Sequence, residues 1–423
     1  MRVGVCGLGT VGSGLFRIFQ HGADEIGRKT AAMPQLVQVG CRRDHPDCDL
    51  TATNVTRDIF DVARNPEVDI LVELIGGTDV AKDLVLEAIG NGKHIVTANK
   101  ALIALHGDEV FAAADRQGVT VRYEASIAGG IPIVKAIREG LAGNRINWLA
   151  GIINGTSNFI LSEMSRPGSN RSFEDVLKEA QALGYAEADP TFDVEGIDAA
   201  HKLTILVSIA FGIPLNFPAL FTEGISRITS ADIEFARELG YRIRHLGIGR
   251  RLPDGVELRV HPALVKNDQM LAQVDGVMNA VMVGSDAAGP TLYYGAGAGA
   301  GPTASAVMAD IIDLSRGNLQ VPNLGFTAMS DAQVIDISSI RSSYYLRLGV
   351  HDRPGVMAHV SSILGNHDVS IEALIQKDAR VSAAQIVIVT NEVPESDLDR
   401  AIAELESLDD LTSSISRIRV ADF

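Results

Sequence analysis

The chain has 423 residues, of which 46% are hydrophobic and 21% are charged. This composition is that of a globular protein, and the length predicts two or three domains. The net charge of −16, from 37 Lys and Arg against 53 Asp and Glu, argues against nucleic acid or an anionic membrane as a partner.

The apolar runs and the cysteines indicate the cellular compartment of the protein. The longest apolar run, residues 203–214, is too short to span a bilayer, so we expect a buried helix there. The opening MRVGVCGLGTVG enters a strand directly, and we expect no signal peptide. Cys6, Cys41 and Cys48 lack metal-ligand spacing and fit a reducing cytoplasm. We therefore expect a cytoplasmic protein.

A glycine-rich turn follows the first predicted strand. Residues 2–6 read as a strand, and a helix is expected to about residue 20. The G-x-G-x-x-G pattern between them suits a tight turn and the close approach of a pyrophosphate to the helix N-terminus. The alternative is a turn that serves packing only. In this context we predict a dinucleotide site formed by Gly7, Leu8, Gly9, Thr10, Val11 and Gly12.

The end of the second predicted strand bears on cofactor choice. Residues 36–40 lead into Arg42 and Arg43. An NAD site usually has Asp or Glu at this position, whereas arginine suits the 2′-phosphate of NADP. Asp44 follows closely, so the sequence favours NADP and leaves NAD open. The alternative for both arginines is a solvated loop.

Three more strands are predicted in this first part of the chain, at residues 69–75, 94–97 and 119–123. An open α/β sheet places its ligands at the carboxyl ends of its strands. We therefore expect Lys100 to lie beside the nicotinamide end of a bound cofactor. The alternative is a surface lysine that follows a helix cap at Asn99.

Five carboxylates lie within residues 187–198, directly before an apolar helix. Asp198 and Lys202 are four positions apart and so share one helical face. Lys202 stands at the edge of the buried half of this helix. The acidic cluster and the apolar helix both influence how readily it gives up a proton, which makes it a candidate for proton transfer. The alternative is an exposed ion pair worth a few tenths of a kcal/mol.

The second half of the chain contains a region of strand-like runs and, after it, a glycine-rich segment. Strand-like runs at 256–260, 277–283 and 291–294 predict a mixed α+β layer. A glycine-rich segment, 295–301, then precedes a helix to about residue 314, and it serves either ligand approach or a hinge.

The C-terminal part alternates strands and helices after a connector at 321–343. The predicted order βαββαβ indicates a ferredoxin-like module. Its strands are expected at 344–350, 370–376, 383–390 and 415–420. One helix is expected to follow the turn at 352–357 and to end at about residue 367, and a second helix is expected over 395–406.

Motifs along the whole chain resemble those of homoserine dehydrogenases, in the same order. They are GLGTVG at 7–12, IGG at 75–77, TANKALIA at 97–104, YEASIAGGIP at 123–132, GIINGTSNF at 151–159, ALGYAEADPTFDVEGIDAAHK at 182–202 and YGAGAGAGPTASAV at 294–307. The 180–202 segment is the family's specific signature, whereas the opening glycines occur widely. The DRPGVM turn at 352–357 resembles an ACT domain.

The resemblance implies an α/β fold with three domains. These are an N-terminal Rossmann-like nucleotide-binding domain (1–130, joined by helix 302–316), an α+β catalytic and dimerisation domain (131–320), a linker (321–343) and a C-terminal ferredoxin-like ACT domain (344–423).

Residue roles also follow from the resemblance. Lys202 matches the catalytic lysine, and Lys100 matches a second lysine close to cofactor and substrate. Glu187 and Asp198 match substrate-binding carboxylates, with Asp193 as a helper. The remaining matches are a monovalent cation site, usually for sodium, at Glu124, Ile127, Gly129 and Ile131, and cofactor-contacting positions at Gly184 and Gly299.

The implied activity is the reversible NAD(P)-dependent interconversion of L-homoserine and L-aspartate 4-semialdehyde, in threonine, methionine and isoleucine biosynthesis. In this chemistry the cofactor handles the hydride and the protein handles the hydroxyl proton. We expect Lys202 to relay that proton, directly or through water, while Lys100 polarises the oxygen. A homodimer or homotetramer is expected. The C-terminal module is expected either to bind an amino-acid effector, with threonine as the first candidate, or to form a dimer contact by pairing its sheet with that of a second copy.

Two other functions agree less well with the sequence. An aldehyde-oxidising semialdehyde dehydrogenase needs a cysteine thiolate, and no cysteine follows Cys48. A non-catalytic amino-acid sensor predicts loss of the acid–lysine set, yet Glu187, Asp198 and Lys202 are all present. A fusion to aspartate kinase is not expected, because the nucleotide turn already begins at Gly7.

Overall fold

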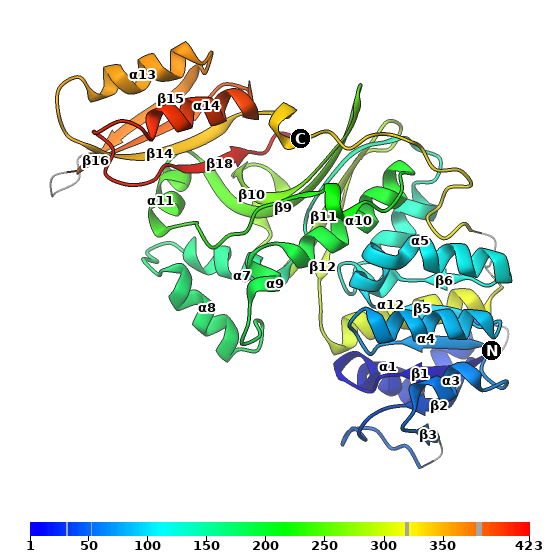
Figure 1. The fold of residues 1–423 in the computed structure, drawn as a ribbon. Helices are drawn as coiled ribbons and strands as arrows, with labels where there is room; N and C mark the ends of the chain where they lie inside the picture. Colours follow the sequence, from blue (N-terminus) through cyan, green and yellow to red (C-terminus); the bar gives the residue numbers. More distant parts are fainter. Residues whose placement is uncertain (31–32, 52, 318–320, 378–382) are drawn as a thin grey trace. The chain divides into compact units, whose positions relative to one another are not determined.

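The computed structural model describes residues 1–30, 33–51, 53–317, 321–377 and 383–423 (Figure 1). The chain forms two compact units, each assembled from three separate segments. The first unit comprises Met1–Ile153, Asp198–Leu220 and Met278–Ala332, and the second comprises Asn154–Ile197, Phe221–Val277 and Gln333–Phe423. Among the described residues, no helix has both the length and the apolar character needed to cross a bilayer.

A six-stranded parallel sheet with the order β3-β2-β1-β4-β5-β6 forms the centre of the first unit. Its strands are β1 (Arg2–Cys6), β2 (Gln35–Gly40), β3 (Asn54–Thr56), β4 (Ile70–Glu73), β5 (His94–Thr97) and β6 (Val121–Arg122). The strand order reverses between β1 and β4, and such a switch point places a ligand crevice outside the carboxyl ends of these strands. The predicted Rossmann-like sheet is confirmed.

Helices connect and flank this sheet. They are α1 (Thr10–His21), α2 (Ala23–Gly27), α3 (Ile59–Arg64), α4 (Asp79–Gly90), α5 (Lys100–Gln117) and, from far along the chain, α12 (Ala300–Ser315). Figure 1 shows α12 beside α1, and a Cβ added to Gly14 would lie 2.5 Å from the carbonyl oxygen of Ala300. Only glycine permits this close approach of the two helices. Buried side chains of α12, such as Val307 and Ile311, therefore join the same apolar core as Leu15.

The rest of the first unit contains three antiparallel strands and further helices. Strand β11 pairs with β7 on one side and with β12 on the other. These elements are β7 (Ile146–Ile152), β11 (Met278–Ser285), β12 (Gly289–Ala296), α6 (Ile133–Lys135), a π-helix (Ala136–Gly140) and α10 (Ile197–Phe211), which belongs to this unit from Asp198 onward.

The second unit is built on strands in the order β9-β10-β18-β14-β16-β15, with β8 beside β10. The strands are β8 (Phe221–Thr222), β9 (Tyr241–Leu252), β10 (Gly255–Lys266), β14 (Tyr344–His351), β15 (Ile371–Lys377), β16 (Ala383–Thr390) and β18 (Ser416–Val420), with β13 (Arg341–Ser342) and β17 (Val393–Pro394) forming a separate pair. The helices are α7 (Gly155–Met164), α8 (Phe173–Ala182), α9 (Thr191–Val194), α11 (Ser230–Glu238), α13 (Val356–Asn366) and α14 (Glu395–Leu405).

The C-terminal module has the predicted βαββαβ order, β14-α13-β15-β16-α14-β18. Its sheet order is β18-β14-β16-β15, and α13 and α14 cover the same face of it (Figure 1). The ferredoxin-like module is therefore confirmed. Strand β18 also pairs with β10 in parallel, so the module continues the sheet of its own unit.

The structure contains strands that the sequence pattern did not predict. Strand β3 is short and partly exposed, and β9 carries several arginines and a histidine among its apolar residues. The predicted strand 119–123 is reduced to the two residues of β6. The predicted domain limits stay a prediction, and the limit at residue 320 lies outside the described residues.

A buried ion pair joins α11 to the first strand of the C-terminal module. Asp232 is fully buried, and its carboxylate accepts hydrogen bonds from Arg347 Nε at 2.8 Å and Arg347 Nη2 at 3.1 Å. The Tyr345 hydroxyl donates to the same carboxylate at 3.2 Å. Burial acts to raise the pKa of Asp232, but Arg347 and Thr229 outweigh it, so that the pKa lies below its ordinary value.

We predict that Asp232→Asn lowers the free energy of unfolding by about 3–5 kcal/mol at neutral pH, because Arg347 is left as a buried, uncompensated charge. Since the folded pKa of Asp232 is depressed, its stabilisation is complete above the unfolded pKa of about 4 and is lost as the pH falls through the folded pKa. Urea denaturation across acidic and neutral pH measures both effects.

The matched control for this prediction is Asp399→Asn, which breaks an ion pair on the surface of the same module, where the side chain is 54% exposed. We expect this variant to change stability by less than about 1 kcal/mol. Equal destabilisation by both substitutions would contradict the prediction.

Candidate active site

The first two turns of α10 carry a buried acid, Asp198, and a partly buried lysine, Lys202. Gly196, with a positive φ of 84°, joins α9 to α10, and Asp198 then occupies the positive end of the helix. Lys202 follows one turn later. Its Nζ donates to Asp198 Oδ2 at 2.7 Å and to the carbonyl oxygen of Ile153, at the end of β7, at 2.8 Å.

A second lysine reaches the same carboxylate. Lys100 Nζ lies 3.2 Å from Asp198 Oδ1, so each oxygen of Asp198 faces a different ammonium group. The side chains of Asp198 and Lys202 are only 7% and 12% exposed. The alternative of a solvated surface pair is therefore wrong, and the geometry is that of two cations held by one buried acid.

Lys100 is held by the start of α5, where β5 ends. Asn99 is the N-cap residue of this helix, and its Oδ1 accepts from the backbone N–H of Leu102 at 3.1 Å. Lys100 is the first helical residue, and its side chain is 31% exposed. Lys100 thus follows the carboxyl end of β5 and the helix cap at Asn99, and its place beside a nicotinamide stays a prediction.

The neighbouring strand end holds an acid that the sequence analysis missed. Glu73 ends β4 and is fully buried. Its carboxylate accepts hydrogen bonds from the backbone N–H groups of Ile75 and Gly76 and from the Thr97 hydroxyl. The only signal in the sequence was an acidic residue at the end of an otherwise apolar strand.

The glycine-rich turn after β1 has the geometry that a pyrophosphate requires. Gly7 has a φ of 102°, and a Cβ there would lie 2.5 Å from the carbonyl oxygen of Leu74. A Cβ at Gly12 would lie 2.2 Å from the carbonyl oxygen of Gly7. At Gly9, by contrast, an added Cβ meets no atom within 4 Å, so the start of α1 is open to a ligand.

Cations gather at the end of β2, beyond Gly40. Arg42 and Arg43 are exposed, as the solvated-loop alternative also allows. Arg57, from the turn after β3, was missed by the sequence analysis. Its Nη1 donates to the carbonyl oxygen of Cys41 at 3.2 Å, and its Nη2 donates to Asp44 Oδ1 at 2.9 Å. Arg57 therefore partly neutralises Asp44, an acid that lies two residues after Arg42.

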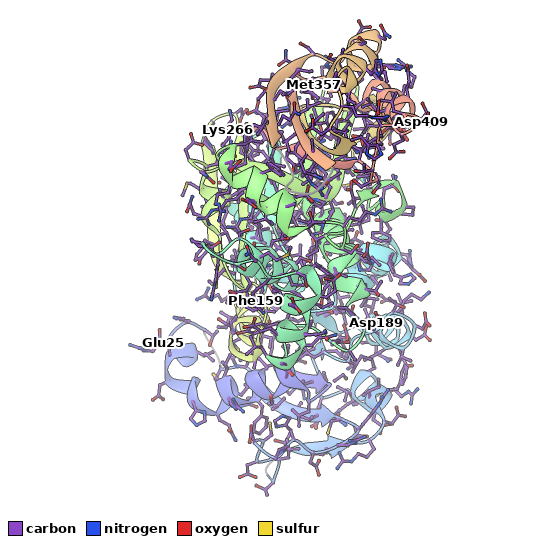
Figure 2. The ribbon with its side chains drawn as sticks, turned by 90° about the vertical axis from the view of Figure 1, so that its left-hand side faces the viewer. Glu25, Phe159, Asp189, Lys266, Met357 and Asp409 are labelled. Atoms are coloured by element: carbon purple, nitrogen blue, oxygen red, sulfur yellow. The ribbon has the colours of Figure 1, made fainter. Side chains whose placement is uncertain are left out.

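The other predicted substrate residues belong to the second unit. Glu187 is exposed, and Asp193 Oδ1 accepts a hydrogen bond from Asn154 Nδ2 at 2.8 Å. The predicted cofactor residue Gly184 is exposed in the same unit and has a φ of 76°. Asp189, labelled in Figure 2, accepts from the backbone N–H of Thr191 and so fixes the loop before α9.

The predicted cation loop lies in the first unit and has an unusual backbone. Ala128 and Gly129 both have positive φ values, of 51° and 53°. The Glu124 carboxylate accepts from the backbone N–H groups of Val134 and Lys135, at 2.9 and 2.8 Å. Burial raises the pKa of Glu124 to about 7, although these hydrogen bonds act to lower it.

The surroundings of this loop fit a hard cation. A Cβ at Gly129 would lie 2.6 Å from the carbonyl oxygen of Gly297, so two backbone segments meet here. Asn279 packs against Gly297 and is 1% exposed, and its amide oxygen has no hydrogen-bond partner among the described residues. Carbonyl and amide oxygens are ligands that hard cations prefer. Gly299, the other predicted cofactor residue, is exposed just before α12 and has a φ of 122°.

Comparison with known families gives three matches along the chain. Residues 7–124 match the homoserine dehydrogenase NAD-binding domain, residues 132–312 match homoserine dehydrogenase, and residues 344–410 match the ACT domain.

Relatives match over the whole length. The homoserine dehydrogenase of Pseudomonas aeruginosa is 57% identical, and the match covers 99% of this chain and 98% of that protein. The crystal structure of a homoserine dehydrogenase from Thiobacillus denitrificans superposes with a TM-score of 0.94 at 52% identity, covering 100% of this chain and 98% of that one. A hyperthermophilic archaeal homoserine dehydrogenase in complex with NADPH has a TM-score of 0.63 at 25% identity, covering 78% and 99%.

Full-length identity above one half, together with family matches in all three parts, leaves no competing assignment. The aldehyde-oxidising alternative and the sensor alternative are both set aside. The chain belongs to the homoserine dehydrogenase family, whose members are NAD(P)-dependent oxidoreductases acting on homoserine.

Proposed function

We propose that Lys202, Asp198 and Lys100 form the proton-handling site for the interconversion of homoserine and aspartate 4-semialdehyde. The observation that carries this proposal is the buried carboxylate with one ammonium group on each oxygen. A nicotinamide cofactor, when bound at the Gly7–Gly12 turn, supplies the hydride acceptance and donation. The protein then has to orient the alcohol and remove its proton.

The two lysines differ in ways that suggest different roles. Lys202 is nearly buried and is anchored by Asp198 and by the Ile153 carbonyl, which supports a fixed proton relay. Lys100 is 31% exposed and stands at the carboxyl edge of the parallel sheet, where it is suited to polarise the substrate oxygen. We propose that Asp198 holds both ammonium groups in place and still contacts substrate, because a carboxylate has about four acceptor sites and the lysines use two.

The substrate's ammonium group requires further acidic partners. We propose Glu187 for this contact, with Asp193 as a helper that Asn154 holds in place. The exposed position of Glu187 within its unit leaves its carboxylate available to a charged ligand. An unchanged KM for homoserine in Glu187→Gln would rule this contact out.

We predict that Lys202→Ala lowers kcat by about 10²–10⁴-fold, the usual range for loss of a general acid or base. Cofactor affinity should stay nearly unchanged, because the side chain contacts Asp198 and Ile153 and not the glycine turn. Steady-state kinetics with homoserine and a fluorescence titration of the reduced nucleotide measure the two quantities.

Lys82→Ala is the control, since this lysine belongs to α4 and pairs with Glu109 at 3.5 Å, not with Asp198. Its kcat should equal that of the unaltered protein. Near-normal turnover in Lys202→Ala would remove Lys202 from the proposed site.

We propose NADP as the preferred cofactor, with NAD as a weaker one. The proposal is supported by Arg42 and Arg43 after β2 and by Arg57, which is placed to offset Asp44. Planar guanidinium groups bind phosphate oxygens in pairs, so this cluster suits a 2′-phosphate. The related archaeal homoserine dehydrogenase was solved in complex with NADPH.

We predict that Arg42→Ala raises KM for NADP by about tenfold, the effect of losing roughly 1.4 kcal/mol of charge-assisted hydrogen bonding. KM for NAD should change much less, because NAD lacks the 2′-phosphate. Arg28→Ala, at another exposed arginine of this unit, serves as the control. Equal effects on both cofactors would contradict the assignment.

A monovalent cation, with sodium as the first candidate, is proposed at the loop of Glu124, Ile127, Gly129 and Ile131. Its support is the left-handed pair Ala128–Gly129 together with the buried amide oxygen of Asn279. The cation would order the segment that precedes α6. Identical activity and thermal stability in sodium, potassium and tetramethylammonium buffers would exclude this site.

We propose that the ACT module binds threonine as an effector. Gly355, with a φ of 97°, is the N-cap residue of α13, and the backbone N–H groups at the start of this helix can bind a carboxylate.

The chain is proposed to act as a homodimer or homotetramer with the domain limits predicted above. A monomer in sedimentation experiments would refute the oligomer. A cytoplasmic location is also proposed, because the three cysteines are free and buried, and cell fractionation can test it.

We predict that threonine raises the melting temperature of the full-length enzyme and lowers its activity. At a threonine concentration one hundred times Kd, the added stability is about 2.7 kcal/mol. Valine, which has nearly the same shape but no hydroxyl, is the matched control ligand. If threonine changes neither quantity, the effector assignment is wrong.

A further inference from the structure

Glu73 is a buried acid that the proposed proton-handling site does not use. It ends β4 at the switch point of the parallel sheet, where its register partners are Cys6 on β1 and Thr97 on β5. In the part of the chain that the structure describes, no Lys, Arg or His forms an ion pair with it. Burial raises the pKa of Glu73, although its hydrogen bonds from Thr97, Ile75 and Gly76 act to lower it.

Among the described residues, the hydrogen bonds to Glu73 come from the two loops at the carboxyl edge of the sheet. Oε1 accepts from the backbone N–H groups of Ile75 at 2.9 Å and Gly76 at 3.1 Å, and Oε2 accepts from Thr97 Oγ1 at 2.6 Å. Gly76 and Gly77 have φ values of 71° and 73°. This left-handed turn directs the successive N–H groups of Ile75 and Gly76 at Oε1 of Glu73.

The same hydrogen-bond chain continues to the start of α5. Thr97 Oγ1, which donates to Glu73, accepts from the backbone N–H of Asn99 at 2.9 Å. The Asn99 side chain then caps α5 through Leu102 and donates to the carbonyl oxygen of Gly77 at 2.6 Å. The β4 turn and the β5 turn are thereby tied into one closed network, and the residue that follows this network directly is Lys100.

We propose that Glu73 is a positioning residue that, through Thr97 and Asn99, holds Lys100 against Asp198. The inference rests on the role proposed above for Lys100. A lysine side chain has several free rotations, so the place of its ammonium group depends on a fixed backbone at the helix start. A displacement of about 1 Å at a reacting centre can cost roughly 10²-fold in rate.

The decisive experiment is a double-mutant cycle between Thr97→Val and Lys100→Met. Valine keeps the shape of threonine but removes both the donor to Glu73 and the acceptor for Asn99. We expect Thr97→Val alone to lower kcat for homoserine by about tenfold or more, at the low end of a positioning loss. When Lys100 is already methionine, adding Thr97→Val should lower kcat no further, because coupled residues are not additive.

Three further variants separate positioning from general damage. Thr97→Ser keeps the hydroxyl and should restore most of kcat. Thr120→Val removes a hydroxyl that is 6% exposed at the opposite edge of the same sheet, and it should leave kcat unchanged. Glu73→Gln keeps the size of the side chain but replaces one acceptor oxygen with an NH2 donor. This variant takes the place of Thr97→Val if Thr97→Val does not fold. Melting temperature and nucleotide affinity are measured for every variant.

The outcomes distinguish this inference from the function on which it depends. Additive losses in the cycle, or normal kcat in both Thr97→Val and Glu73→Gln, would overturn the positioning role while leaving the lysine assignments intact. Normal turnover in Lys100→Met would instead remove the proposed role of Lys100, and the inference would fall with it.

Discussion

The arrangement of the first unit around its reactive groups depends on one buried carboxylate facing two ammonium groups. Asp198 stands at the positive end of α10, and the two lysines reach it from the same helix and from the start of α5. Removing either kind of charge would leave the other uncompensated in a largely buried place. These ion pairs and the hydrogen bond from Lys202 to Ile153 connect α10 with the start of α5 and with the residue after β7.

Groups of different chemistry converge at the carboxyl edge of this sheet for a topological reason. Parallel strands all end on the same side, so the glycine turn after β1, the buried Glu73 that ends β4 and Lys100 after β5 lie along one edge. Positive-φ glycines at positions 7, 76 and 77 allow the backbone to turn sharply there. The same edge of the sheet thus carries the glycine turn before α1 and the capped start of α5.

Much of this was predictable from the sequence, because periodicity and short motifs report on local structure. The glycine turn, the Asp198–Lys202 spacing and the βαββαβ module were all correctly predicted. Strand β9 was missed because Arg244 and His245 interrupt its apolar pattern, although both side chains are buried. Glu73 and Arg57 were missed for a different reason, since their roles come from partners distant in the sequence, which spacing alone does not reveal.

Helix α12 adds a consequence for biosynthesis. Residues from 300 onward complete the apolar core around Leu15, and the close contact of Gly14 with Ala300 has no substitute earlier in the chain. A ribosome must therefore translate nearly three quarters of the message before the opening β–α segment finds its permanent neighbour. Until then the nascent polypeptide exposes apolar surface around Leu15, and chaperones or non-native contacts have to cover that surface to prevent aggregation.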